Sequence, residues 1–494
     1  MITTTDALSL VGAPQAAHVA GRWSAGTSGT PLAVSDPATE TTLCELELAS
    51  AAQVDAAVAA ARDAFDAGPW PRRSPVQRSA ALHGLADQFE READRFAQLL
   101  VHEIGAPVSG VRGGQVDSAI ELLRWFADAA ATGPAGGWEL TLGLHHAPRR
   151  SASVLRHEPA GVVAGLTAYN FPLLLLVRKL GGALAAGCTI VLMPSPRAPL
   201  STIAFMRLLE RTDIPTGAAN LVVGAADAGA RLTSSPGVDM VTFTGSAAVG
   251  RAVMRQAADT TKRVVLELGG KSPNLLLPGA DVEAAVGPSL LRFSLNAGQA
   301  CGATTRTFVP RADYDRYVAA ARAFLDEQLV VGDPRDPATD VGPLIGADQL
   351  AFVAGHVERA LAAGGRVEAG GRRERARGWY FDPLLIGGVG NDAEISREEL
   401  FGPVGVVIPY DTVEEAIALA GDNRYALNAN VWGPTEEALA VARRLRSGNV
   451  TVNGGGGLRP DAPWGGLGES GIGRDGGEAG LREFLELKHV QWPV

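Results

Sequence analysis

The feature that most constrains the fold is a regular alternation of short apolar runs and amphipathic segments, which begins near residue 160. The apolar runs have the composition of buried strands, and the segments between them have helical periodicity. This alternation is typical of a mostly parallel, doubly wound sheet with helices on both faces. We therefore expect strands at 161–167, 189–193, 219–223 and 239–243, and helices at 173–186, 199–211 and 247–257.

The remainder of the chain extends this α/β pattern. Two polar, alternating runs at 139–158 predict an exposed β-hairpin, and the C-terminal tail predicts a helix followed by an edge strand. The predicted fold class is α/β, with two doubly wound Rossmann-like domains and a small hairpin-and-tail module. We expect further helices at 51–66, 74–104, 118–131, 314–327, 347–363, 414–422 and 436–447, and strands at 304–309 and 450–453.

Length and composition limit the classes of protein to which this chain can belong. The 494 residues carry a formal net charge of −10, which argues against nucleic acid or an anionic membrane as a partner. Three cysteines in a chain of this length favour a reducing, cytoplasmic location without a disulfide framework. No signal peptide is evident, the apolar run at 173–177 is too short to span a membrane, and no histidine–cysteine cluster predicts a metal site.

A candidate nucleophile lies in the stretch NAGQACGATTR at 296–306. Its cysteine, Cys301, is surrounded by glycines and alanines, which allow a close backbone approach and favour a loop over a core strand. A thiolate is a strong nucleophile near neutral pH when its pKa is lowered or a base is near. Taken alone, the stretch favours a small buried residue, the common fate of free cysteine.

Two further polar residues follow apolar, strand-like runs. Glu267 ends the run VVLE before a Gly-Gly turn, and a buried carboxyl there would have a raised pKa and act as a base. Asn170 follows GVVAGLTAY, and its side-chain amide can donate to a developing oxyanion. Taken alone, an outward-facing strand residue explains Glu267 equally well, and a simple turn explains Asn170 better.

Together, these stretches resemble the aldehyde dehydrogenase superfamily. The matching segments are YNFP at 169–172, FTGSAAVG at 243–250, ELGGK at 267–271, NAGQAC at 296–301, EELFGPV at 398–404 and APWGGLGESGIGRDGG at 462–477. They have the order and spacing of that family, and the resemblance extends from GRWSAG at 21–26 to the tail. It implies a cofactor-binding domain at 1–138 and 159–267, a catalytic domain at 268–480, and an oligomerisation module at 139–158 and 481–494.

The resemblance implies a mechanism in which Cys301 attacks an aldehyde carbon. The Asn170 side-chain amide and the Cys301 backbone N–H would hold the oxyanion. Hydride would pass from the thiohemiacetal to a nicotinamide cofactor, and Glu267 would activate water to hydrolyse the resulting thioester. Lys179 matches a lysine that supports the proton path. The product would be a carboxylic acid.

The resemblance also assigns residues to the cofactor. Glu399 matches the residue that hydrogen-bonds the nicotinamide ribose, and Phe401 matches the ring beside the nicotinamide. Gly245 and Ser246 match the pyrophosphate contacts, although the sequence alone favours a plain turn with Ser246 as the helix N-cap. A G-x-G-x-x-G pattern at 471–476 has no room for a βαβ unit, and we interpret it as a flexible loop near the active site. The remaining expected cofactor contacts are Met193, Thr167 and Leu268.

One segment departs from the family pattern on the adenosine side. Where the family writes VLKP-x-E, whose lysine and glutamate contact the ribose, this chain has VLMPSPR. Met193 and Pro196 cannot make those hydrogen bonds, and no carboxylate there repels a 2′-phosphate, which Arg197 could attract. We expect NAD as the cofactor, with NADP as the alternative. Tyr169 stands where tryptophan is common and preserves an aromatic wall.

One loop bears on the substrate. Gly454 to Gly457 carry no side chains, which predicts a roomy entrance for a bulky, aromatic or terpenoid aldehyde, with Trp125 and Phe293 lining it. Arg459 offers an alternative, a semialdehyde whose carboxylate it would recognise.

Two other classes of function remain open from the residues alone. A cysteine-dependent ester hydrolase would use Cys301 and Glu267 but would have no use for the cofactor contacts. A non-catalytic protein could retain the fold as a structural or binding module. The hairpin and tail predict subunit pairing through edge strands, and the resemblance implies a homodimer or homotetramer.

Overall fold

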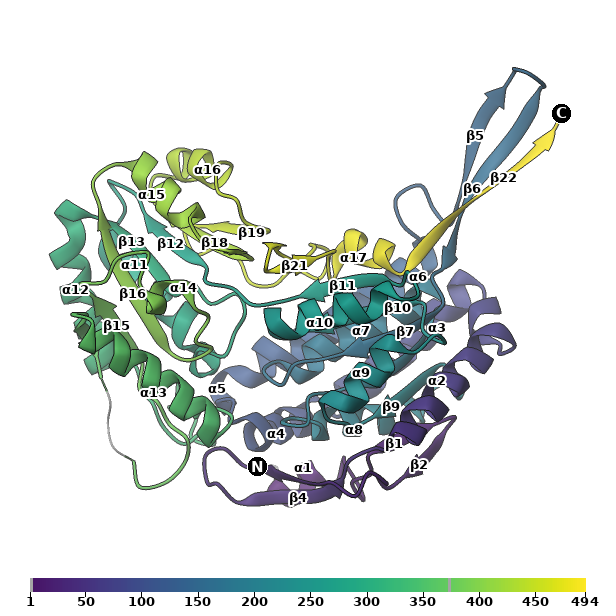
Figure 1. The fold of residues 1–494 in the computed structure, drawn as a ribbon, viewed down its shortest axis with the longest axis horizontal. Coiled ribbons are helices and arrows are strands. Elements are labelled where there is room, and N and C mark those ends of the chain that lie inside the picture. The colour runs from purple at the N-terminus through teal and green to yellow at the C-terminus, as the bar shows by residue number, and fades with distance from the viewer. Residues whose placement is uncertain (1–2, 372–374) are drawn as a thin grey trace.

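The computed structural model of the protein describes residues 3–371 and 375–494. It contains two large sheets, each with its own hydrophobic core, and a long three-stranded arm (Figure 1). Most neighbouring strands in the two large sheets are parallel. This architecture confirms the predicted α/β class with two doubly wound units.

The first sheet has the strand order β2-β1-β9-β8-β7-β10-β11-β21. Its strands are β1 (Ala17–Val19), β2 (Arg22–Ser24), β7 (Val162–Leu166), β8 (Thr189–Met193), β9 (Ala219–Val222), β10 (Met240–Thr244), β11 (Arg263–Glu267) and β21 (Gly471–Ile472). Strands β7 to β10 are buried along their whole length, which explains their uninterrupted apolar sequences. The strand order reverses between β7 and β10, and such a reversal opens a crevice at the carboxyl ends of the strands.

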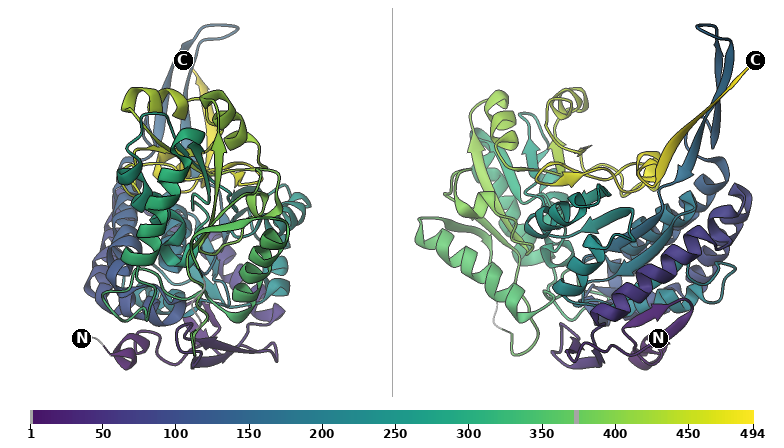
Figure 2. Two further views of the ribbon diagram at one scale, coloured as in Figure 1. Left: turned by 90° about the vertical axis from the view of Figure 1, so that its left-hand side faces the viewer. Right: turned by 45° about the vertical axis from the view of Figure 1, so that its right-hand side comes forward.

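Helices cover this sheet on both faces (Figures 1 and 2). They are α1 (Thr4–Leu8), α2 (Ala51–Asp66), α3 (Pro75–Arg91), α4 (Ala93–Ile104), α5 (Val108–Val111), α6 (Ser118–Thr132), α7 (Pro172–Ala186), α8 (Leu200–Leu209), α9 (Ala226–Ser234) and α10 (Ala247–Ala258), with a separate hairpin of β3 (Pro31–Ser35) and β4 (Thr42–Glu47). The single helix predicted at 74–104 is wrong, because Glu92 leaves helical geometry. The break lets α3 pack on α6 while α4 packs on α1 and α8.

The second sheet has the order β14-β15-β16-β13-β12-β18-β19, with only β14 antiparallel to its neighbour. Its strands are β12 (Pro273–Leu276), β13 (Arg306–Pro310), β14 (Arg366–Gly370), β15 (Leu384–Gly387), β16 (Val404–Tyr410), β18 (Asn428–Trp432) and β19 (Asn449–Val452). The accompanying elements are α11 (Val282–Ser294), α12 (Tyr314–Ala323), α13 (Ala347–Ala362), α14 (Glu394–Arg397), α15 (Val413–Gly421), α16 (Thr435–Ala442), β17 (Tyr425–Ala426) and β20 (Leu467–Gly468). The predicted helix at 314–327 is confirmed, because a π-helical segment, Phe324–Gln328, continues α12. The predicted helix at 436–447 ends earlier, at Ala442.

Strand β21 returns the C-terminal part of the chain to the first sheet. Gly471 pairs with Glu267 and Ile472 pairs with Leu266, antiparallel to β11. The prediction of a flexible loop is therefore wrong at Gly471 and Ile472, because the open edge of β11 gives them hydrogen-bond partners. The pairing places this segment directly beside Glu267.

The arm consists of β5 (Glu139–His145), β6 (Ser151–Pro159) and β22 (Leu485–Pro493), in the order β22-β6-β5. Helix α17 (Gly477–Glu483) leads into β22, so the predicted hairpin, helix and edge strand are confirmed. The arm projects away from both sheets, with the C-terminus close to its tip (Figures 1 and 2). Within the described residues, none of the helices combines the length and apolar character needed to cross a bilayer.

Candidate active site

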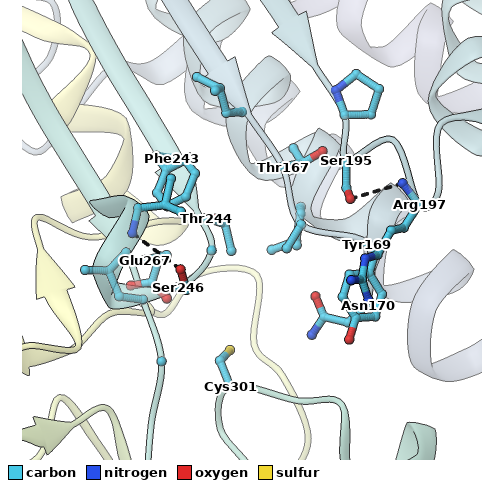
Figure 3. A pocket seen from close by; sticks show the side chains of 18 of the residues that line it. Thr167, Tyr169, Asn170, Ser195, Arg197, Phe243, Thr244, Ser246, Glu267 and Cys301 are labelled. Atoms are coloured by element: carbon cyan, nitrogen blue, oxygen red, sulfur yellow. Dashed lines mark hydrogen bonds between the residues drawn. The ribbon is translucent and has the colours of Figure 1, made fainter. Parts of the chain in front are cut away.

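A cavity of about 1050 Å³, here called the central cavity, lies where β7, β8, β10 and β11 end. Loops of the second sheet complete its wall, and most of its lining is apolar. Cys301, Glu267 and Asn170 face this common space from different segments (Figure 3). The structure thus brings together the three residues that the sequence singled out.

The loop before Cys301 has an unusual backbone. Residues 296–298 all have positive φ, between 53° and 73°, which is costly for residues other than glycine. Glycine is required at Gly298, because a Cβ there would lie 2.2 Å from the carbonyl carbon of Gly402. On the other side, a Cβ on Gly270 would lie 2.4 Å from the Cys301 carbonyl oxygen. Two close glycine contacts therefore constrain the backbone of the loop that carries Cys301.

Asn170 is held against the same loop. Its Nδ2 donates to the Gln299 carbonyl at 2.8 Å, and its own backbone carbonyl accepts from Asn296 Nδ2 at 3.0 Å. The Gln299 side chain is fixed in turn, since its Oε1 accepts from the Ile345 amide at 2.9 Å. An amide nitrogen carries two hydrogens, so Asn170 keeps one for a group in the central cavity.

Glu267 is the last residue of β11 and is 2% exposed. Burial, with the nearby charge of Asp475, raises the pKa of this carboxyl to about 8, while Arg178, Lys179 and Arg474 oppose the rise. Its Oε1 has no hydrogen-bond partner within the described chain. A carboxyl with a pKa in this range can act as a base near neutral pH.

Lys179 does not face the central cavity directly. Its Nζ donates to Asp475 Oδ2 at 2.6 Å, and both side chains are almost fully buried. Asp475 lies in the segment that the sequence analysis interpreted as a flexible loop near the active site, and its contact with Lys179 was missed. The pattern GRDGG gave no signal for it, because only the fold places it beside Lys179 and Glu267.

The Cys301 thiol is partly exposed to the central cavity. Burial raises its pKa to about 12, and the charges of Glu267 and Glu399 add to the rise. Arg178 and a backbone hydrogen bond to Gly302 act in the opposite direction. The thiol is therefore neutral at physiological pH, and forming a thiolate requires a base close by.

Gly245 and Ser246 also line the central cavity, at the junction of β10 and α10. The Gly245 amide donates to the Glu267 carbonyl at 3.0 Å, and a Cβ there would lie 2.4 Å from the Phe243 ring. The Ser246 hydroxyl accepts from the Val249 amide and caps α10. The N-cap interpretation of Ser246 is therefore confirmed.

Three more predicted cofactor contacts lie along the same wall. Met193 ends β8 and is 6% exposed, and its carbonyl accepts from the Thr167 amide at 3.1 Å. Leu268 packs against Gly250 of α10, where a Cβ would lie 2.6 Å from the leucine methyl. All three residues line the central cavity.

Glu399 and Phe401 enter from the second sheet, just before β16. Glu399 Oε1 accepts from the Gly270 amide at 3.0 Å, and burial raises the pKa of this carboxyl to about 7. The Phe401 ring stands edge-on to Tyr169, with ring centroids 5.8 Å apart. An acidic group and an aromatic pair therefore stand opposite the strand ends.

The prediction that Trp125 and Phe293 line the substrate entrance is wrong. Phe293 is 1% exposed in the second core, against Gly405. Trp125 packs edge-on against Phe126 of α6, with ring centroids 5.2 Å apart, and does not line the central cavity. Both large rings are used to fill space between helices and sheets. The cavity is lined instead by Phe171, Leu174, Leu175, Leu458 and Trp464.

The sequence analysis considered two arginines, Arg197 for a 2′-phosphate and Arg459 for a substrate carboxylate, and each forms an ion pair with an aspartate. Arg197 forms an ion pair with Asp348 across the two halves of the molecule and lies 5.6 Å from the Tyr169 ring centroid. Arg459 forms an ion pair with Asp461 at 2.6 Å on the surface. Arg197 nevertheless lines the central cavity, and so does Arg178, which the sequence analysis missed.

Neither a metal site nor a disulfide accompanies these groups. Among the described residues, no group of histidine, cysteine and acidic side chains is arranged to hold a metal ion. Cys44, Cys188 and Cys301 are all free thiols.

Comparison with known proteins agrees with this arrangement. The profile of the Aldehyde dehydrogenase family matches residues 23–490. A 3-succinoylsemialdehyde-pyridine dehydrogenase of a Pseudomonas species is 38% identical over 96% of this chain and 97% of its own length. The crystal structure of a Pseudomonas syringae aldehyde dehydrogenase mutant with NAD⁺ and octanal superimposes with a TM-score of 0.91, at 38% identity and 96% coverage of both chains.

A second solved structure gives the same result. The aldehyde dehydrogenase of Mycobacterium tuberculosis, in complex with NAD⁺, has a TM-score of 0.92 and 37% identity, covering 97% of this chain and 98% of its own. The family profile spans nearly all of the chain, and both structures match its whole fold. The chain therefore belongs to the aldehyde dehydrogenase family of oxidoreductases.

Proposed function

We propose that this enzyme oxidises an aldehyde to a carboxylic acid with NAD, through a covalent intermediate on Cys301. The observation that carries the proposal is the convergence of Cys301, Glu267 and Asn170 on the central cavity. A nucleophile, a base and an amide donor around one space can carry out acyl chemistry on a carbonyl carbon.

In the first step, Cys301 Sγ bonds to the aldehyde carbon. Because burial keeps the thiol protonated and Glu267 has the lower pKa, the Glu267 carboxylate is the group that takes the thiol proton. The carbonyl oxygen becomes an oxyanion, held by the second N–H of Asn170 Nδ2 and by the Cys301 backbone N–H. Donors fixed before the charge develops contribute about 3 kcal/mol each in comparable sites.

The central cavity suits a dinucleotide in this structure. Its lining runs continuously from Met193 past Gly245 and Ser246 to Glu399 and Cys301. Small-molecule sites occupy roughly 300–1000 Å³, so a cavity of about 1050 Å³ has room for a cofactor and a substrate together. The NAD⁺ complexes of the two similar structures support the same choice.

When bound, NAD supplies a nicotinamide that accepts the hydride released from the thiohemiacetal carbon. We assign Glu399 to the nicotinamide ribose hydroxyls, because its Oε2 remains an acceptor while Oε1 is held by Gly270. Phe401 would pack beside the nicotinamide. The pyrophosphate would lie at the first turn of α10, capped by Ser246, where helix amides and the dipole favour anions.

Loss of hydride leaves a thioester on Cys301, which water must hydrolyse. We propose that Glu267 removes a proton from this water, since its pKa of about 8 lets it act as a base near neutral pH. The buried pair of Lys179 and Asp475 acts on Glu267 through its charges and supports proton transfer away from it.

The adenosine side of the cavity bears on the choice between NAD and NADP. Met193 and Pro196 line it without hydrogen-bonding groups in their side chains, and Arg197, which also lines it, is paired with Asp348. We expect kcat/KM to favour NAD. A preference for NADP above about tenfold, or 1.4 kcal/mol, would refute this assignment.

We propose an aldehyde with a bulky apolar body as substrate. Gly456 and Gly457 have open space where side chains would stand, and Leu458 and Trp464 line the cavity beside them. A substrate with a large apolar surface gains more binding free energy from contact with such a wall than acetaldehyde does. A strong preference for acetaldehyde over benzaldehyde and octanal would contradict the assignment.

The arm supports a homodimer or homotetramer. Leu140, Leu487 and Trp492 are exposed on its strands, and both its edges offer unpaired backbone groups. The three free thiols support a reducing, cytoplasmic environment. Sedimentation of the purified enzyme distinguishes the oligomers.

The decisive test follows NAD reduction with octanal as substrate. We expect activity that depends on both NAD and aldehyde, and its loss in Cys301→Ala with the fold retained. Hydrolysis of an ester without NAD, in the absence of any aldehyde oxidation, would instead favour the hydrolase alternative. Undiminished activity in Cys301→Ala would place the chemistry elsewhere.

A further inference from the structure

Helix α9 presents one face to the central cavity. Four of its residues line that space at the i, i+3, i+4 and i+7 positions of a single helix face: Ala226, Gly229, Ala230 and Thr233. The first three carry a methyl group or no side chain, and only the last has a polar group. Met193 of β8 packs beside this face, since its Cε would lie 3.5 Å from a Cβ on Gly229. The face is therefore apolar and ends in a hydroxyl.

Helix α10 presents a matching face to the same cavity. Its lining residues repeat the spacing seen on α9: Val249, Ala252, Val253 and Gln256. The two helices pack against each other, so their faces enclose one slot, here called the helix slot. The polar residue of each face stands at the same end of it, because Thr233 Oγ1 donates to Gln256 Oε1 at 2.6 Å.

The amide of Gln256 keeps an unused donor at this end of the slot. Its Oε1 accepts from Thr233, and its Nε2 forms no hydrogen bond within the part of the chain that the structure describes. The Thr233 side chain is inaccessible to solvent, so it holds the oxygen of the amide and leaves the nitrogen for a ligand. An amide nitrogen carries two hydrogens, and both can be donated.

The position of the helix slot identifies what it would hold. The proposed function places the pyrophosphate at the first turn of α10 and the nicotinamide toward Cys301, so the adenosine extends the other way, along α10. Gln256 lies seven residues beyond Val249, which is about 10 Å along the helix axis. Small apolar side chains on both walls suit a flat base, and a few polar groups fix the orientation of a ligand in such a site.

We infer that Gln256 recognises the adenine base by donating from Nε2 to its ring nitrogen N1, which lies on the edge away from the ribose and is a hydrogen-bond acceptor. This contact would take the place of the ribose hydrogen bonds that the side chains of Met193 and Pro196 cannot make. The inference rests on the proposed function, because it uses the placement of the pyrophosphate at α10.

The experiment measures dissociation constants by calorimetry, without aldehyde, for NAD and for etheno-NAD, whose N1 is alkylated and cannot accept. We expect the wild type to bind NAD about tenfold more tightly than etheno-NAD, the usual contribution of one neutral hydrogen bond. Gln256→Leu should bind NAD about tenfold more weakly and lose the preference. Thr233 keeps an acceptor in this variant, since the Gly229 carbonyl lies 2.9 Å from its hydroxyl. Met254→Leu, at an exposed position of α10 outside the cavity, is the control and should change neither value.

Two results would overturn the inference. The first is an unchanged affinity for NAD in Gln256→Leu. The second is a preference for NAD over etheno-NAD that persists in Gln256→Leu, because leucine fills a similar volume and the preference would then reflect the size of the base. A protein that shows the expected binding but oxidises no aldehyde would lose the proposed function and keep the inference. If NADP binds more tightly than NAD, the same comparison with NADP and its etheno form tests Gln256, since the base is shared.

Discussion

Lys179 Nζ lies 2.6 Å from Asp475 Oδ2, and neither side chain is accessible to solvent. Asp475 raises the pKa of Glu267 and Lys179 lowers it, so the pair sets the charge environment of the base. The two partners come from α7 and from the segment after β21, which are far apart in the sequence. Proton chemistry at Glu267 thus depends on groups that touch no substrate.

Asp475→Asn should move the pH profile. Removing the negative charge leaves Lys179 charged, so the pKa of Glu267 falls and the acid limb of kcat shifts to lower pH, by on the order of one unit. The unpaired lysine should also reduce the free energy of unfolding by about 3–5 kcal/mol. Urea denaturation measures the second effect, with Asp461→Asn of the exposed pair as a control that costs about 1 kcal/mol or less.

Glu267→Gln should impair both halves of the reaction. We expect NAD reduction in the first turnover to slow, because the Cys301 thiol loses the base that takes its proton, and steady turnover to fall by about 10²–10⁴-fold, because the thioester also lacks the base that activates water. Stopped-flow absorbance measures the first turnover, and mass spectrometry measures acyl transfer to Cys301. Steady turnover at the wild-type rate would assign the base elsewhere.

The raised pKa of Glu267 also predicts how stability varies with pH. The folded protein holds this proton up to about pH 8, whereas the unfolded chain releases it near the ordinary value of 4.5. Between these values the folded state binds more protons, so this group makes the free energy of unfolding fall as pH rises. The decline should be smaller in Glu267→Gln than in the wild type, as measured by urea denaturation across that range.

Asn170→Ala should lower kcat/KM by about 10²–10³-fold, the cost of losing one oxyanion donor. The same substitution removes the bond to the Gln299 carbonyl, so placement of the loop must be checked separately. The rate of Cys301 alkylation by iodoacetamide provides that check. An unchanged alkylation rate assigns the loss to oxyanion stabilisation, whereas a full loss of alkylation would point to a displaced thiol.

Gly298→Ala should inactivate the enzyme through its backbone. The glycine has a φ of 73°, and a methyl group there would lie 2.2 Å from Gly402. The loop must move, and a displaced nucleophile costs about 10²-fold or more. Gly456→Ala is the matched control, because nothing lies near its missing side chain. Similar activity of the two variants would show that the loop tolerates rearrangement.

Much of the fold followed from local patterns. The buried strands β7 to β10 have apolar sequences because both faces of the sheet are covered. Glu267 ends β11 and Asn170 follows β7, so both reach the cavity at the strand ends, whereas Cys301 reaches it from the loop between α11 and β13. The motif resemblance supplied their roles, which periodicity alone left open.

What the sequence analysis missed depends on long-range packing. The break at Glu92 is visible only when α3 and α4 are seen to pack on different partners. Phe293 was expected at an entrance, but a large ring beside Gly405 stabilises the second core. Arg178 could have been predicted as a cavity residue, since its spacing from Phe171 and Leu174 places the three on one helix face. The role of Asp475 could not have been predicted, because its partner lies on another element.

The pairing of β21 with β11 has a consequence for how this enzyme can be divided. A gene cut between Glu267 and Leu268 would give one polypeptide whose sheet lacks its last strand, and another whose strand has no sheet to join. Neither product would hold the Lys179–Asp475 pair. We expect such fragments to recover a functional centre only when they are expressed together, so that each completes the other.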